Sequence, residues 1–279
     1  MDLSIWIVLI GTALIGICAA LVGTFTFLQK KSLIGDAISH SILPGIVLAY
    51  MLSGQRTAWG LMLGAFCAGW FATQQISWLQ WKTRLKSDTI VAATLSMFFA
   101  FGLALLSYIQ GRPDDGQAGL GDFLFGKIAA LDIRDLYLFL GISTVIIIAI
   151  FLRYRVMFSF AFNREFMISK GFSLRWNDFI LNSMTILVVT MGVQAVGVVL
   201  MSALLIIPVL SARMLTCRLS QILLFSVLLG TFSSLLGSYI SILGANIPTG
   251  PCIIIILSAC AIIIALTVKL QSKRKSHGK

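Results

Sequence analysis

Two ionisable residues lie four positions apart in an apolar stretch near the start of the chain. Residues 35–45 read GDAISHSILPG, so the pair is Asp36 and His40, and His40 is one of only two histidines. On a helix, positions i and i+4 share one face, so a carboxylate and an imidazole would converge on one point. Such a pair provides half of a site for a divalent transition metal.

A structural interpretation of the same spacing stays open at this point. Asp36 could cap the helix or reach the cytoplasmic surface, while His40 makes a buried hydrogen bond. In a metal site, the other ligands would have to come from water, backbone or another subunit. Pro44 and Gly45 are expected to break or kink the helix and free backbone carbonyls, which membranes tolerate only where the helix lines protein or a water-filled cavity.

The composition places this pair in an integral membrane protein. Of the 279 residues, 58% are hydrophobic and 11% are charged, and the mean hydropathy is +0.98. Soluble domains carry about 25% charged residues. The same composition excludes a disordered protein, a coiled coil and a disulfide scaffold. We expect one all-α transmembrane domain over residues 1–279, built as a polytopic helical bundle.

Apolar segments long enough to cross a bilayer recur along most of the chain. A crossing helix needs about 20 mostly apolar residues. The stretch at residues 177–215 suits two crossings, or one crossing plus a re-entrant segment. Counted as two, it brings the total to about nine transmembrane passes, the others lying near residues 4–28, 33–52, 58–80, 88–110, 134–152, 221–243 and 250–269.

The basic residues indicate how these passes are oriented. With alternating passes, all but four of the 21 Lys and Arg residues fall on one side, the exceptions being Arg56, Arg112, Lys127 and Arg134. The positive-inside rule then predicts an external N-terminus and a cytoplasmic basic tail at residues 270–279. The net charge of +11 is therefore expected to mark cytoplasmic loops and not a nucleic-acid-binding surface.

The longest cytoplasmic loop, residues 153–176, contains a short amphipathic stretch. This stretch reads REFMISKG from Arg164 to Gly171, and Gly171 suits the C′ position of a helix. It is either a solvated basic loop at the lipid surface or a short helix that docks on a cytoplasmic partner. The sequence has no Walker A, GxSxG, HExxH or GxGxxG motif, so we expect no enzymatic activity, no catalytic residues and no permanently bound cofactor.

Four blocks of the sequence resemble the membrane permease subunits of bacterial ABC importers for manganese, zinc and iron, the ABC-3 family. They are residues 23–45, 117–126, 196–216 and 248–251, and together they touch most of the chain. The resemblance implies a type II importer fold, similar to that of vitamin B12 permeases. A nine-pass chain with an external N-terminus suits that fold without its first helix.

The resemblance also implies roles for single residues. Asp36 and His40 would form a metal-coordinating site within the translocation channel. Glu165 and Gly171 would belong to the cytoplasmic coupling helix, which sits in a groove of the ATP-binding subunit. Relatives more often have Asp where this chain has Asn246, so the change argues against a metal-facing role for that external turn.

The function implied is ATP-driven alternating access in the bacterial cytoplasmic (inner) membrane. An extracytoplasmic metal-binding protein would deliver the ion, two permease subunits (the same or related chains) would enclose its path, and two cytoplasmic ATP-binding subunits would drive the cycle. One carboxylate with one imidazole suits Mn²⁺, Zn²⁺ or Fe²⁺ better than Cu⁺. The resemblance of residues 117–126 favours manganese.

Two other classes of membrane protein would have different sequence features. A gradient-driven secondary transporter or channel would need more intramembrane carboxylates and recognisable paired repeats. Only Asp36 and Asp178 lie near membrane depth, and no clear repeat is present. A membrane enzyme with a metal centre would need more than one histidine within the spans, where only His40 is available.

Overall fold

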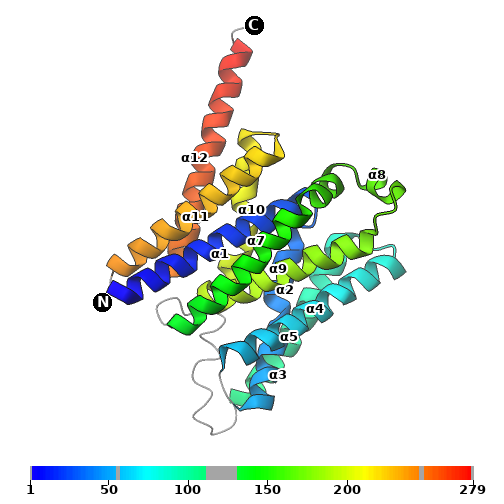
Figure 1. Cartoon of the computed structure of the whole chain (residues 1–279), viewed down its shortest axis with the longest axis vertical. Coiled ribbons are helices and arrows are strands. Elements are labelled where there is room, and N and C mark those ends of the chain that lie inside the picture. Colours follow the sequence, from blue (N-terminus) through cyan, green and yellow to red (C-terminus); the bar gives the residue numbers. More distant parts are fainter. Residues whose placement is uncertain (1, 55–56, 111–130, 245–247, 278–279) are drawn as a thin grey trace. The chain divides into compact units, whose positions relative to one another are not determined.

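The computed structural model describes residues 2–54, 57–110, 131–244 and 248–277, and the regular elements in these ranges are all helices. The predicted all-α architecture is thus confirmed (Figure 1). Two features named above, residues 117–126 and Asn246, lie outside the described residues. The helices are α1 (Asp2–Leu28), α2 (Ser32–Ser41), α3 (Leu43–Ser53), α4 (Ala58–Lys82), α5 (Ser87–Gln110), α7 (Ile133–Phe162), α8 (Arg164–Ser169), α9 (Leu174–Val196), α10 (Val198–Leu215), α11 (Leu219–Leu243) and α12 (Thr249–His277).

Within the described ranges, seven helical segments are long and apolar enough to cross a membrane. They match seven of the nine predicted passes, with α2 and α3 counted together as one. Helices α4 and α10 occupy the positions of the other two. Helix α4 has 25 residues, enough to span about 30 Å of hydrocarbon, whereas α10 has 18. The crossings by α4 and α10 stay predictions.

The stretch at residues 177–215 forms two helices, which meet at Gly197. This glycine ends α9 with a φ of 91°, a conformation that strongly favours glycine, and α10 begins at the next residue. Helix α7 also differs from its expected length, because it continues through Phe162 beyond the predicted end at residue 152. Much of the predicted loop at residues 153–176 is therefore helical.

The chain divides into two compact units. One comprises Met1–Lys30, Ile128–Arg164 and Ala203–Lys279, and the other comprises Lys31–Lys127 and Glu165–Ser202. This division rests on contacts and does not test the single domain predicted over residues 1–279, which stays a prediction.

In the first unit, α1 packs against α7 and α11, and α11 packs against α12. The Ser238 hydroxyl of α11 donates a buried hydrogen bond of 3.0 Å to Thr12 Oγ1 of α1. Because both hydroxyls lie in an apolar surrounding, this bond ties the two helices together at a defined register.

In the second unit, α2 and α3 form one apolar span that is interrupted at Ile42. The break comes just before the predicted position, so that Pro44 falls in the first turn of α3, where a missing N–H costs nothing. The Ile42 N–H bonds the carbonyl of Ile38, and the Ile46 N–H bonds that of Ile42. The helix is therefore interrupted here without being unwound, and Pro44 has no N–H to donate to the carbonyl of His40.

Helices α3 and α4 touch through their backbones. A Cβ atom added to Gly45 would lie 2.1 Å from the carbonyl oxygen of Gly64, and one added to Gly64 would lie 2.3 Å from that of Gly45. Small residues at this contact, with Ala49 and Ala68 beside the glycines, permit an approach that any larger side chain would block. This contact fixes α3, and with it the chain that follows His40.

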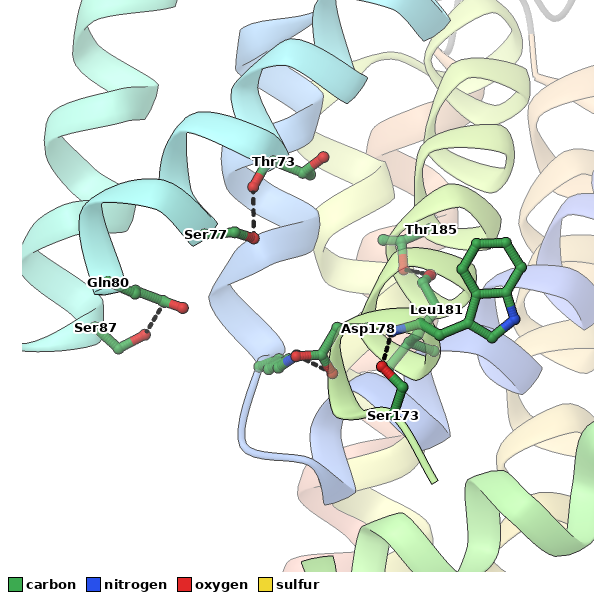
Figure 2. A network of polar contacts seen from close by, with 10 residues as sticks. Thr73, Ser77, Gln80, Ser87, Ser173, Asp178, Leu181 and Thr185 are labelled. Carbon is green, nitrogen blue, oxygen red and sulfur yellow. Dashed lines mark hydrogen bonds and ion pairs between the residues drawn. The ribbon is translucent and has the colours of Figure 1, made fainter. Parts of the chain in front are cut away.

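The basic ends of several helices lie together in the second unit. Lys31 before α2 pairs with Asp178 of α9 at 2.6 Å, and the Arg175 guanidinium of α9 lies over the Trp81 ring of α4 at 6.0 Å. At the α4–α5 junction, the Gln80 amide donates to the Ser87 hydroxyl at 2.9 Å (Figure 2). The residues predicted for one side of the membrane therefore meet at one end of this unit.

The contact between Gly45 and Gly64 generates the first prediction. Gly45→Ala should destabilise the folded protein by about 1–3 kcal/mol, because its methyl group overlaps backbone that cannot rotate away. The matched change is Gly141→Ala in α7, where an added Cβ meets nothing within 4 Å. Thermal unfolding of the purified protein in detergent should show a lower midpoint for Gly45→Ala only. Equal midpoints for the two variants would contradict this packing.

Candidate metal site

Helix α2 leaves two side chains partly open in an otherwise buried stretch. From Ile34 to Val47, every residue is buried except Asp36 and His40. Their side chains are 38% and 28% exposed, respectively. Burial of an ionisable group in hydrocarbon costs about 2.5–3.5 kcal/mol or more, so two partly open ionisable side chains within a predicted span make this stretch the candidate site.

The predicted i, i+4 geometry of the pair is confirmed. His40 Nε2 lies 3.9 Å from Asp36 Oδ1, too far for a strong hydrogen bond. A transition-metal ion binds imidazole nitrogen and carboxylate oxygen at about 2.0–2.2 Å each, so one ion can bridge atoms up to about 4.3 Å apart. The two side chains can therefore contact a single cation without moving the helix.

An aromatic side chain from α5 fixes the imidazole of His40. The Phe99 ring packs edge-on against it, with ring centroids 5.1 Å apart and an interplanar angle of 83°. The Nδ1 atom of His40 is buried and has no hydrogen-bond partner among the described residues. The sequence analysis missed Phe99, because spacing within one helix carries no information about which α5 residue faces it.

The pair does not complete a metal site within the described residues. No group of three or more His, Cys, Asp and Glu side chains is placed there to hold an ion. Other donors would have to supplement Asp36 and His40.

The predicted coupling stretch forms the short helix α8. The Gly171 N–H bonds the carbonyl of Ile168 and the Phe172 N–H bonds that of Met167, while Gly171 has a φ of 82°. This hydrogen-bond pattern is a Schellman motif with glycine at C′, as the sequence predicted. Met167 is buried whereas Glu165 is exposed, so α8 is anchored on one side and accessible on the other.

Helix α9 follows the coupling segment directly. The Ser173 hydroxyl caps α9 by accepting a hydrogen bond of 3.4 Å from the backbone N–H of Trp176 (Figure 2). Asp178, one turn further on, is the carboxylate that the sequence placed near membrane depth. Asp178 pairs with Lys31. The only sign of this contact in the sequence was that Lys31 is a basic residue immediately before the helix that carries Asp36 and His40.

Comparison with known proteins matches the ABC 3 transport family over residues 2–269. The zinc transport system membrane protein TroC of Treponema pallidum is 35% identical, over 94% of this chain and 88% of the relative. The manganese transport system membrane protein MntC of Bacillus subtilis is 36% identical, over 90% of this chain but only 58% of the relative. The manganese import system permease protein ScaB of Streptococcus parasanguinis is 31% identical, over 96% of this chain and 92% of the relative.

Solved structures give the same result. PsaBC from Streptococcus pneumoniae, in complex with Fab, superposes with a TM-score of 0.81 at 28% identity, covering 92% of this chain and 89% of that one. This likeness agrees with the predicted importer-permease fold. The resemblance found in the sequence is confirmed, and the chain belongs to the ABC 3 transport family as a multi-pass membrane transport subunit and not as an enzyme.

Proposed function

We propose that this chain is the permease subunit of an ABC importer that carries a divalent transition metal into the cytoplasm by ATP-driven alternating access. The observation that carries the proposal is the partial exposure of Asp36 and His40, 3.9 Å apart, within residues 34–47, which are otherwise buried. Relatives named as zinc and manganese transport proteins support a metal as the substrate. Manganese is our first choice, with zinc and iron as the other candidates.

An incomplete ligand set suits a transported ion. A translocation site must bind the ion well enough to replace part of its hydration shell and weakly enough to release it. Asp36 and His40 offer one oxygen and one nitrogen ligand, and the remaining positions can be filled by water, backbone or a second permease subunit. The absence of a thiolate from the pair disfavours Cu⁺.

The transport cycle requires partners. Because the sequence lacks a Walker A motif, ATP hydrolysis is assigned to two separate cytoplasmic ATP-binding subunits. The exposed side of α8, with Glu165, Phe166 and Ile168, is the surface proposed to dock on them, and Gly171 ends this helix. A second permease, identical or related, and an extracytoplasmic metal-binding protein complete the assembly.

The proposed location is the bacterial cytoplasmic membrane, with an external N-terminus and a cytoplasmic C-terminus. The grouping of Lys31, Lys82 and Arg175 at one end of the second unit supports this orientation, since short cytoplasmic loops are enriched in basic residues. The alternative, a gradient-driven transporter or channel, is disfavoured because the chain belongs to an ABC family.

The metal site can be tested in the reconstituted complex with near-isosteric variants. Asp36→Asn and His40→Gln should each lower Mn²⁺ or Zn²⁺ uptake by about 100-fold or more, because losing a ligand costs at least as much as losing an outer-shell partner. Ser39→Ala, a buried change between them that removes only a hydrogen bond to the carbonyl of Gly35, should leave uptake near wild type. Uptake within twofold of wild type in Asp36→Asn and His40→Gln would return both residues to structural roles.

The coupling role of α8 makes a separate prediction. Glu165→Arg should weaken association with the ATP-binding subunit, because it reverses a charge on the proposed docking surface. The control is Asp88→Arg, the same reversal at an exposed position in the first turn of α5. Co-purification of the ATP-binding subunit should fall for Glu165→Arg alone, and an equal yield from both variants would contradict docking through α8.

A further inference from the structure

An ion pair joins the metal-site helix to the helix that follows the coupling segment. Lys31 Nζ lies 2.6 Å from Asp178 Oδ1, and the two side chains are only 18% and 23% exposed. We propose that this pair is the link through which movement of α8 reaches α2, so that Lys31 and Asp178 position the Asp36–His40 site during the transport cycle. This inference rests on the proposed function.

On the coupling side, α8 is connected to Asp178 by a short and ordered segment. Gly171 ends α8 through two backbone hydrogen bonds, and Ser173 caps α9 two residues later. The Ser173 carbonyl also accepts a hydrogen bond of 3.2 Å from the backbone N–H of Asn177, so the turn before Asp178 is regular helix. A displacement of α8 can therefore pass through this short segment to the first turns of α9, where Asp178 lies.

On the metal side, Lys31 occupies the N-cap position of α2, and Asp36 and His40 follow within the same helix. A positive charge at a helix N-terminus opposes the helix dipole. The first turn of α2 has no acidic residue to offset that charge. The carboxylate of Asp178, on α9, compensates the positive charge of Lys31. This electrostatic attraction holds the start of α2 to α9.

The surroundings of the pair make this attachment stronger than an ordinary surface contact. Exposed ion pairs contribute little because water and salt screen them, whereas partly buried pairs are screened much less. Removal of one partner leaves the other charge uncompensated in a poorly hydrated place. The cation–π contact of Arg175 with Trp81 also ties α9 to a neighbour, but it joins α4 and does not reach the metal-site helix.

The test uses the complete complex with its ATP-binding subunits and binding protein, and measures Mn²⁺ uptake and ATP hydrolysis in the same vesicles. Lys31→Met and Asp178→Asn should each lower the number of ions imported per ATP by about 2- to 30-fold, the range found for residues that couple distant sites. Equilibrium Mn²⁺ binding without ATP should stay at the wild-type level. Lys30→Met, at the exposed neighbouring lysine, is the matched control and should preserve the wild-type ratio.

A double variant separates a link from two independent roles. If the pair acts as one unit, Lys31→Met/Asp178→Asn should be no worse than the poorer single variant, because the second change removes nothing further. It also leaves no uncompensated charge, so it remains informative if a single variant fails to assemble. An ion-to-ATP ratio equal to wild type in the double variant, or losses that multiply, would overturn the link.

A different result would contradict the proposed function itself. A wild-type complex that hydrolyses ATP but imports neither Mn²⁺ nor Zn²⁺ would overturn the proposed function, and the link with it. Wild-type import combined with unaffected Lys31 and Asp178 variants would overturn the link alone.

Discussion

The burial of α2 and α3 is the constraint on which the rest of the account depends. Between Ile34 and Val47 every side chain of this helix pair is buried except those of Asp36 and His40, so these two are the ones that can reach an ion. Ionisable groups at membrane depth are too costly to be retained without use. Their i, i+4 positions on α2 place the two atoms 3.9 Å apart, a separation that one cation can bridge.

Contacts from three neighbouring helices hold that arrangement in place. The glycine contact with α4 fixes α3 directly after His40, Phe99 of α5 fixes the imidazole plane, and Asp178 of α9 holds the start of α2. Each contact acts at a different point along the α2–α3 span. A site that must open and close in turn needs such rigid attachment, because a helix that slipped against its neighbours would not transmit a displacement.

Local chemistry made much of this predictable from the sequence. The i, i+4 relation of Asp36 and His40 and the C′ role of Gly171 follow from patterns within a few residues. Two crossings within residues 177–215 were one of two alternatives, favoured by the distribution of basic residues over the whole chain. The predicted break at Pro44 and Gly45 is present but falls at Ile42, because Pro44 lies in the first turn of the following helix. The contacts of Phe99 with His40 and of Lys31 with Asp178 join distant segments, and in one sequence no periodicity encodes such partners.

The most direct measurement of the central claim is pulsed electron paramagnetic resonance of Mn²⁺ bound to the purified complex. If one ion touches the Asp36–His40 pair, the spectrum will show a nitrogen coupling from a directly bound imidazole, and His40→Gln will weaken or remove it while Ser39→Ala preserves it. A bound Mn²⁺ ion whose nitrogen coupling is absent in wild type, or identical in His40→Gln, would contradict the account.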